Sequence, residues 1–509
     1  MKPSLIAAAL AASAPAWAQD LPASVVVTGN PLGAKDLATP ASVLTGKDLV
    51  LRRGSTLGET LDGLPGVSST YFGPNANRPV IRGQDGDRIR VLGNGGASFD
   101  ASSLSFDHAV PIDPLVVERV EVLRGPAALS YGGSAVGGVV NAIDNRIPRE
   151  AVTAVSGAFE GRLGGAAGER AASALVEGGG GALAWHADAF WRRTDDLSVP
   201  DFDRPLEDGS SERRNFIANS ASRADGGALG GSFVWDAGYV GASVDTYRND
   251  YGIVAEDDIT IRMRRDRIAL AGELRPRGGF FSALRAQGAG TDYRHQEIEG
   301  DGSVGTTFAN DGSDARLEAV HRALALGGGQ LEGSFGLQYE SSDFSALGEE
   351  AFVPSTHTRQ QSVFVLERWS WGEGGSVSSG LRAEQGVEQL AGRRSGGVAP
   401  AVAVMTGMTG MTVVVRMAPG ACGVVGRHRH GIGVPRPVRN GMGQRLPLRQ
   451  QQGQQGHADD AARGVGAAER LHAVARSRSG STADRVGWQG VASCHRPPSM
   501  PQTTTSGRW

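Results

Sequence analysis

The 509-residue sequence has little of several features that define common protein classes. It holds only two cysteines, Cys422 and Cys494, which excludes a disulfide-rich scaffold. No run of about 18 apolar residues follows the N-terminus, which excludes a helical membrane protein. The formal net charge is −3 and no block of like charge stands out, so no nucleic-acid partner is expected. We find no Ser/His/Asp order, phosphate loop or usable Cys/His spacing, so we expect no enzyme and no resident cofactor.

The N-terminus, by contrast, carries a clear export pattern. Lys2 precedes a short apolar stretch, and Ala16-Trp17-Ala18 satisfies the small-x-small cleavage rule. We therefore expect residues 1–18 to be a signal peptide and the mature chain to start at Gln19. A buried apolar helix is the alternative.

The composition changes abruptly near residue 394. All 15 Phe and all 7 Tyr precede that position, and both cysteines follow it. Residues 394–509 hold 15 Arg, no Lys and 4 acidic residues, a formal charge of +11, so the −3 total leaves −14 for residues 1–393. The two parts need separate interpretations.

The first part of the mature chain suggests a short linker and then a compact domain. Val25, Val26, Val27 and Thr28 form a strand-prone run in the segment 19–39, suited to pairing with a partner's sheet edge or to serving as an ordinary first strand. Residues 40–148 combine short helices with short strands and glycine-rich turns, which predicts an α+β domain.

Residues 149–393 show repeated two-residue alternation. In Leu183–Arg192, for example, leucine and tryptophan alternate with histidine, aspartate and arginine. The same pattern recurs in Arg267–Arg275, Ser334–Glu340 and Gly380–Glu384. Such segments are typical of a transmembrane antiparallel β-barrel, with lipid outside and a plug or water inside. A soluble β-sandwich or propeller is the alternative, which the export signal disfavours.

Two motifs resemble a known family. The run Val116–Asn141, VVERVEVLRGPAALSYGGSAVGGVVN, closely resembles the end of the plug domain of TonB-dependent outer-membrane receptors. Pro79–Gly83 is similar to the other signature of that plug, and Val25–Thr28 then resembles the TonB box. The resemblance implies the cell outer membrane, an energy-transducing TonB partner and contact with outer-membrane lipid.

A finer resemblance concerns the branch that takes up zinc. Gly83–Arg90 and Ser103–Pro111 are similar to plug segments of that branch, in which an Asp-His pair helps to bind the metal. The resemblance assigns this role to Asp107 and His108, although a hydrogen-bonded turn before Pro111 is the plainer interpretation. It also implies a loop glutamate as a ligand.

The loop glutamate is either Glu349 or Glu350, and His295 with Glu297 forms a weaker candidate pair. Imidazole and carboxylate donors suit Zn²⁺, which would be transported cargo. Tyr251–Arg267 departs from the zinc branch because it contains acids but no histidine.

The segment 394–509 does not have the pattern of strands, and a non-barrel C-terminal segment is expected. We interpret it as translated out of frame, with a basic disordered tail as the alternative. The repeated Met-Thr pairs in Met405–Thr412 provide a test, because reading back one base turns each pair into xAT-GAC. If x is C, the intended chain has a His-Asp-rich loop there.

These expectations combine into one functional hypothesis. The chain resembles a receptor for energised uptake of a metal ion or metal complex, with zinc favoured, through a plugged barrel. Because receptors of this type have about 22 strands and an unclosed barrel exposes unpaired edges to lipid, we expect this product to be impaired. The alternatives are an iron-siderophore or haem receptor, and a passive surface barrel or adhesin.

Overall fold

The computed structural model describes most of the chain between residues 42 and 416. The described residues are 42–206, 208–349, 351, 353–372 and 375–390, with the backbone alone of 402–416. The expected signal peptide, the run Val25–Thr28, Glu350 and the tail from residue 417 lie outside them. None of the helices in the described part is long and apolar enough to cross a membrane.

The N-terminal domain, called the plug below, is built of short elements around a small sheet. In chain order these are β1 (Ser42–Thr45), α2 (Gly46–Arg52), α3 (Leu57–Leu61), β2 (Val67–Ser69), β3 (Pro79–Ile81), η2 (Gly86–Arg88), β4 (Ile89–Gly93), β5 (Gly96–Ala97), η3 (Pro114–Val116), β6 (Arg119–Leu123), α4 (Pro126–Leu129) and β7 (Gly138–Ile143). The main sheet has the order β1-β6-β7-β4-β5, in which only β4 and β7 run parallel. The expected α+β domain is therefore present.

Local sequence explains why these elements begin and end where they do. Thr56 caps α3, because its side chain accepts a hydrogen bond from the backbone N–H of Glu59 at 3.2 Å. All six residues of β7 are buried, and Val140 packs with Leu61 and Ile81 in the plug core. Gly138 has φ +142°, and a Cβ there would lie 2.6 Å from the carbonyl oxygen of Leu123, so only glycine fits.

The rest of the described chain forms one large antiparallel sheet, called the wall below. Its strands are β8 (Ser156–Gly164), β9 (Glu169–Gly180), β10 (Leu183–Thr194), β13 (Ser222–Trp235), β14 (Gly238–Gly252), β15 (Thr260–Leu274), β16 (Phe281–Ile298), β17 (Val304–His321), β18 (Leu324–Leu326), β19 (Gly329–Gly348), β20 (Thr356–Trp371), β21 (Gly375–Leu390) and β22 (Val402–Arg416). A separate hairpin pairs β11 (Leu197–Pro205) with β12 (Ser211–Ile217). Among the described residues the sheet does not close, and β8 and β22 are its edges.

The wall confirms the predicted alternation. On β10, Leu183 and Trp185 point outward and are exposed, whereas His186 and Arg192 point inward and are buried. An exposed apolar outer face is unfavourable in water and is expected of a barrel whose surroundings are lipid.

One expectation about the C-terminal segment was wrong. The segment from residue 394 was expected to contain no strand, but Val402–Arg416 forms β22 and pairs with β21. Its valines and threonines have high strand propensity, and the free edge of β21 offers backbone hydrogen bonds. Whether the segment is out of frame stays a prediction.

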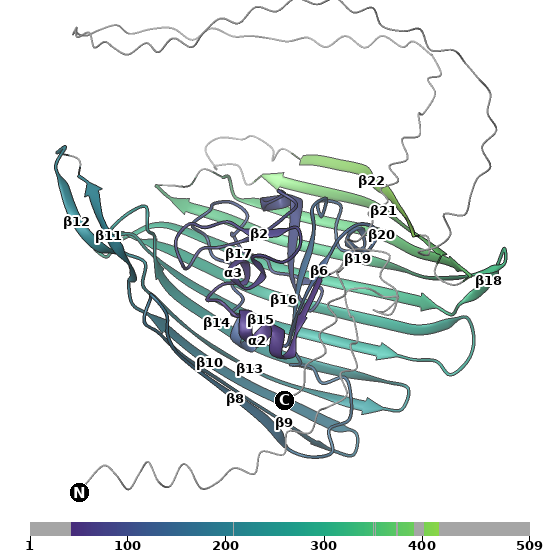
Figure 1. The fold of residues 1–509 in the computed structure, drawn as a ribbon. Helices are drawn as coiled ribbons and strands as arrows, with labels where there is room; N and C mark the ends of the chain where they lie inside the picture. The colour runs from purple at the N-terminus through teal and green to yellow at the C-terminus, as the bar shows by residue number, and fades with distance from the viewer. Residues whose placement is uncertain are drawn as a thin grey trace, which may run out of the picture. The chain divides into compact units, whose positions relative to one another are not determined.

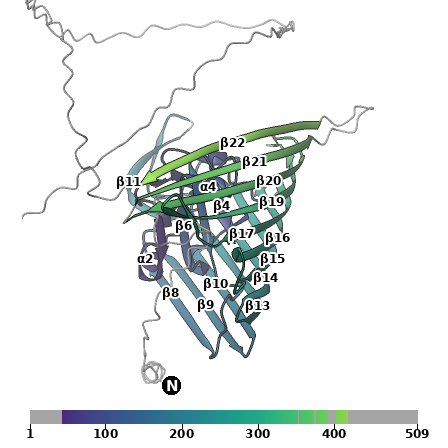
Figure 2. The same ribbon diagram turned by 90° about the vertical axis from the view of Figure 1, so that its right-hand side faces the viewer.

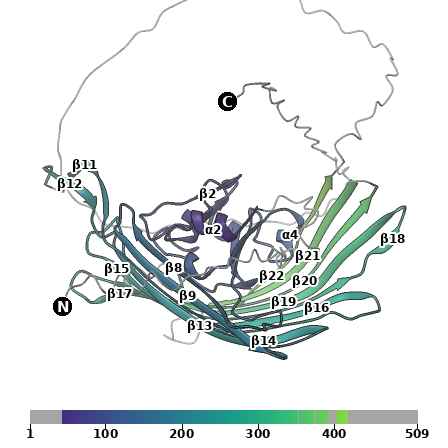
Figure 3. The same cartoon turned by 60° about the horizontal axis from the view of Figure 1, so that its bottom comes forward.

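The plug lies on the concave side of the curved wall, as Figures 1 and 3 show. Figure 2 shows the wall strands side by side from β8 to β22. Ion pairs join the two parts. Arg146 with Asp188 at 2.9 Å and Arg192 with Asp113 at 2.8 Å are buried, and Arg90 with Glu340 at 2.8 Å is partly buried. The ring of Phe99 occupies the space that a side chain at position 312 would need, so Gly312 lets the plug approach the wall. The fit of plug to wall thus brings distant parts of the sequence together.

Candidate metal site

Three potential metal ligands meet where a plug loop touches the wall. His108 comes from the plug loop between β5 and η3, and His295 and Glu297 lie near the end of β16. One donor atom from each of the three lies within 4.8 Å of the others, and all three residues are buried. The two imidazole rings are 4.4 Å apart between centroids and inclined at 72°.

The surroundings of His108 determine which of its nitrogens is free. Nδ1 lies 3.0 Å from the carbonyl oxygen of Ala101, and because a carbonyl only accepts, Nδ1 must carry the proton. In the neutral ring Nε2 therefore keeps its lone pair, and this atom faces Oε1 of Glu297 at 3.5 Å. A lone pair facing a carboxylate is favourable only if a proton or a cation lies between them.

His295 presents a second nitrogen to the same place. Its Nδ1 lies 2.8 Å from the hydroxyl of Tyr293, which leaves Nε2 toward the interior. Nε2 is buried and finds no hydrogen-bond partner among the described residues. An unpaired buried polar atom costs about 1–3 kcal/mol, and a coordinated cation removes that cost.

The loop that carries His108 is held from both sides. The hydroxyl of Tyr251 on β14 accepts a hydrogen bond from the N–H of Ala109 at 2.9 Å and donates to the carbonyl of Asp107 at 2.8 Å. On the plug side, the Arg78 guanidinium donates to the carbonyls of Ser102 and Ser105. His108 is thus fixed on both flanks, which is what a preorganised ligand requires.

The structure separates the other residues expected to bind metal from this cluster. The carboxylate of Asp107 accepts a hydrogen bond from the hydroxyl of Ser105, and it is not part of the three-residue cluster. Glu349 is exposed just after β19, where its backbone N–H donates to the carbonyl of Gly305 at 3.2 Å. Glu350 lies outside the described residues. Metal binding by Asp107, Glu349 and Glu350 stays a prediction.

Glu349 nevertheless belongs to an acidic group in the loops near the end of β16. Desolvation, and then the neighbouring carboxylates of Glu256 and Glu349, raise the pKa of Glu299. Asp258 and Asp301 contribute in the same direction. We call these five residues the acidic mouth. Glu299 lies two residues beyond Glu297, so the mouth lies close to the buried donors.

The remaining described histidines have other partners. His186 on the inner face contacts Glu177 at 2.9 Å and Asp188 at 3.0 Å. His321, at the end of β17, is buried with Nε2 at 3.2 Å from Glu367, and its ring stacks on that of Phe280. His186 reaches its two acids with opposite ring nitrogens, so they do not converge on one point. Among the described residues, only the cluster of His108 brings three potential ligand atoms together.

The residues that lie close together are not all the ones that the sequence favoured as ligands. His295 and Glu297 were the weaker pair, yet they share one face of β16, as their two-residue spacing requires. That spacing was the signal available in the sequence. Their proximity to His108, 187 positions earlier, depends on how the plug fits the wall, and no local pattern records it.

Comparison with a known family model matches residues 34–139 to the TonB-dependent Receptor Plug Domain. The chain contains a TonB-dependent receptor plug. This match includes the loop that carries His108 and confirms the resemblance of Val116–Asn141 to that plug over the part up to residue 139.

Solved structures share the fold of plug and wall. The copper transporter OprC matches with a TM-score of 0.56 and 13% identity, over 74% of this chain and 59% of its own. The ferric citrate transporter FecA matches at 0.55 and 17%, over 73% and 59%. The alcaligin outer membrane receptor FauA from Bordetella pertussis matches at 0.54 and 16%, over 75% and 60%. The match thus spans about three fifths of the length of each of these structures.

Proposed function

We propose that this protein is a TonB-dependent outer-membrane receptor that captures a metal ion, with Zn²⁺ as the favoured cargo. The observation that carries the proposal is the convergence of two imidazole nitrogens and one carboxylate where plug meets wall. One ligand belongs to the plug and two belong to the wall, so movement of the plug would take the site apart. Energy delivered through the TonB box at Val25–Thr28 would then release the ion.

The burial of the donors favours a bare ion over a bulky chelate. The side chains of His108 and Glu297 are only 1% and 7% exposed, and His295 is fully buried. Phe308 packs against both imidazoles, with ring centroids 4.9 and 4.6 Å away. A siderophore or haem is too large to reach these atoms without rearranging the loop, whereas a dehydrated ion fits between them.

The donor set favours zinc among common metal ions, with copper as the second candidate. Two neutral imidazoles and a carboxylate, with a fourth position left for water, are typical of sites from which Zn²⁺ can leave. Cu²⁺ binds such donors at least as strongly in the general order of affinities. A copper transporter is among the structures with the same fold, so copper must be included in any test.

Metal binding to the full-length chain tests the proposal directly. Purified protein is titrated with Zn²⁺ and Cu²⁺ by isothermal titration calorimetry, and the same is done for His108→Ala and Asp107→Ala. We expect one Zn²⁺ site that His108→Ala removes. Unchanged binding in His108→Ala overturns the proposed site, and binding of a ferric chelate in preference to both ions overturns the cargo.

The energised step needs a separate experiment in cells. Metal accumulation is compared between the intact chain and a variant lacking Val25–Thr28, each at equal surface abundance. Because this product is expected to be impaired, uptake by the intact chain should be low. A TonB-dependent receptor loses that uptake on this deletion, while a passive barrel or adhesin does not change.

A further inference from the structure

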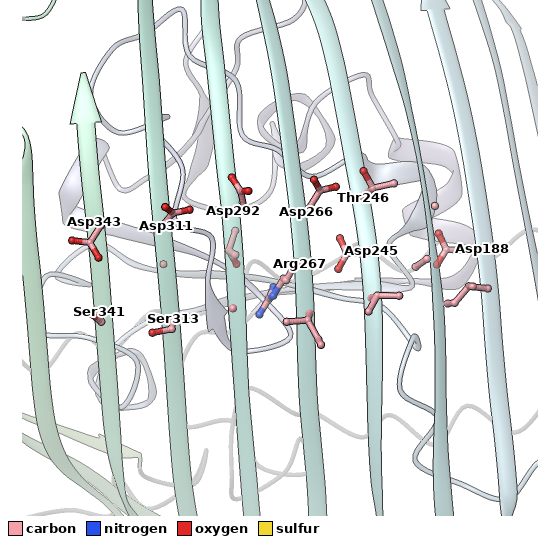
Figure 4. Close-up of a pocket in the computed structure, with 18 residues that line it drawn as sticks. Asp188, Asp245, Thr246, Asp266, Arg267, Asp292, Asp311, Ser313, Ser341 and Asp343 are labelled. Atoms are coloured by element: carbon pink, nitrogen blue, oxygen red, sulfur yellow. The ribbon is translucent and has the colours of Figure 1, made fainter. Parts of the chain in front are cut away.

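The outer face of the wall carries a row of aspartates at one level. Asp266, Asp292, Asp311 and Asp343 lie on four successive strands of the sheet, β15, β16, β17 and β19. Each is the direct cross-strand partner of the next, and Asp343 is paired in turn with His357 on β20. Figure 4 shows the four carboxylates side by side across the strands. We call these four residues the aspartate row.

A row of arginines lies closer to the acidic mouth, two residues from the aspartate row on β15 and β16 and continuing onto the neighbouring strand β14. Arg248, Arg264 and Arg294 are cross-strand partners of one another on β14, β15 and β16. All three are exposed on the outer face. We call these three residues the arginine row.

On the other side of the aspartate row the outer face becomes apolar. Along β15 the outward residues after Asp266 are Ile268, Leu270, Gly272 and Leu274, none of them charged. On β17, Leu317 is 55% exposed on the same face. The two charged rows therefore mark the edge, on the side of the acidic mouth, of an apolar band. In a membrane barrel such a band is about 25 Å tall.

The charges of the two rows are only partly balanced within the protein. Arg264 contacts Asp266 at 2.7 Å, and His357 contacts Asp343. Arg248 reaches Asp225 only at 3.7 Å, with both side chains well exposed. Among the described residues, Arg294, Asp292 and Asp311 form no ion pair.

Asp292 and Asp311 lie directly opposite each other, a like-charge arrangement that destabilises a sheet unless a cation intervenes. Guanidinium groups just above them match phosphate in geometry and charge. The guanidinium of Arg294, which has no ion pair among the described residues, and the weakly paired Arg248 can bind phosphate. The carboxylates of Asp292 and Asp311 can hold a bridging divalent cation, and the apolar band below them can contact acyl chains.

We propose that the arginine and aspartate rows form a docking surface for phosphorylated lipids of the outer leaflet, together with the divalent cations that bridge their headgroups. The inference rests on the outer-membrane location given under the proposed function. Barrels of this kind have short turns at the periplasmic end and longer loops at the outer end. The rows lie at the end of the strands that carries the long connection between β10 and β13, which is therefore the outer end. It does not depend on the metal site, which faces the interior.

Lipid retention by the purified full-length chain tests the surface. The protein in detergent is mixed with lipid A as a phosphorylated probe or with phosphatidylcholine, in Mg²⁺ or in EDTA, and bound lipid is counted by native mass spectrometry. The variants are Arg264→Gln/Arg294→Gln and Asp292→Asn/Asp311→Asn. Arg277→Gln is the matched control, because Arg277 is 82% exposed in the connection at the opposite end of the strands.

We expect the intact chain and Arg277→Gln to retain lipid A over phosphatidylcholine in Mg²⁺. Retention of lipid A should fall about five-fold for each arginine removed. EDTA should lower the retention by the intact chain, but not the retention by Asp292→Asn/Asp311→Asn, which lacks the carboxylates that hold the cation. Equal retention in the arginine variant and the control overturns the proposal, and so does equal retention of the two lipids. Zn²⁺ binding by the same variants should be unchanged. Zn²⁺ titration of the intact chain therefore tests the proposed function separately from the lipid surface.

All substituted residues are exposed, so the variants should fold, and circular dichroism checks this. If the double arginine variant is misfolded, Arg264→Lys/Arg294→Lys replaces it. This variant keeps the charge but loses the paired donors, so we expect retention between that of the intact chain and that of the glutamine variant. Retention equal to that of the intact chain would show a purely electrostatic contact and overturn specific phosphate recognition.

Discussion

The two faces of β16 carry different chemistry on alternate residues of one strand. Inward, Tyr293, His295 and Glu297 are buried. His295 and Glu297 each bring a donor atom within 4.8 Å of one from His108, and the hydroxyl of Tyr293 contacts Nδ1 of His295. Outward, Asp292 and Arg294 are exposed. The inner face depends on a fit between two distant parts of the chain, whereas the outer face depends on the surrounding medium. Substitutions on the inner face should therefore change Zn²⁺ affinity, and substitutions on the outer face should change stability in lipid.

The largest expected effect is on the inner face. His295→Ala removes a ligand that has no substitute nearby, so Zn²⁺ affinity should fall by at least about 100-fold. Isothermal titration of the full-length chain measures it, with His357→Ala on the outer face as the control. Equal loss of Zn²⁺ affinity in both variants would contradict the assignment of the Zn²⁺ site to the inner face.

A charge placed on the outer face tests whether the stability of that face depends on the surrounding lipid. Leu317→Arg puts a guanidinium in the apolar band and should lower the free energy of unfolding in lipid vesicles by about 2–4 kcal/mol. Asp311→Arg lies on the same strand and face, at the charged boundary, and should cost about 0–1 kcal/mol. Urea unfolding measures both. Equal costs would contradict the assignment of the band, and Zn²⁺ binding should be unchanged in each variant.

These two faces also show how far the sequence alone could lead. Two-residue alternation predicted which side chains of β10 point inward, because period two is a property of a single strand. It could not predict that His108 meets His295, because the register between plug and wall is set by many contacts far apart in sequence. Strand propensity was likewise underestimated at Val402–Arg416, where the free edge of β21 supplies hydrogen bonds that composition does not reveal.

A smaller effect is expected where the wall positions the plug loop. Tyr251→Phe removes the hydroxyl that bonds to Asp107 and Ala109, so His108 should lose its fixed position. Zn²⁺ affinity should fall about 10-fold, as for other residues that orient a ligand. Tyr247→Phe is the matched control, since Tyr247 is a buried tyrosine on the same face of β14. Equal losses in the two variants would indicate general loosening of the wall.

The smallest effect should come from the acidic mouth, whose residues are not part of the three-residue cluster. Glu299→Gln removes one of five clustered carboxylates and should slow Zn²⁺ association about two- to three-fold at low salt, with little effect at high salt. The raised pKa of Glu299 means that it takes up a proton at a higher pH than an ordinary glutamate, so the difference between variant and intact chain should shrink as pH falls. Stopped-flow competition with a fluorescent zinc indicator measures the rate, and Asp236→Asn in the opposite connection is the control. If both substitutions slow association equally, net charge acts over the whole surface; if only Glu299→Gln does, cations enter on the same side as the buried donors of the inner face.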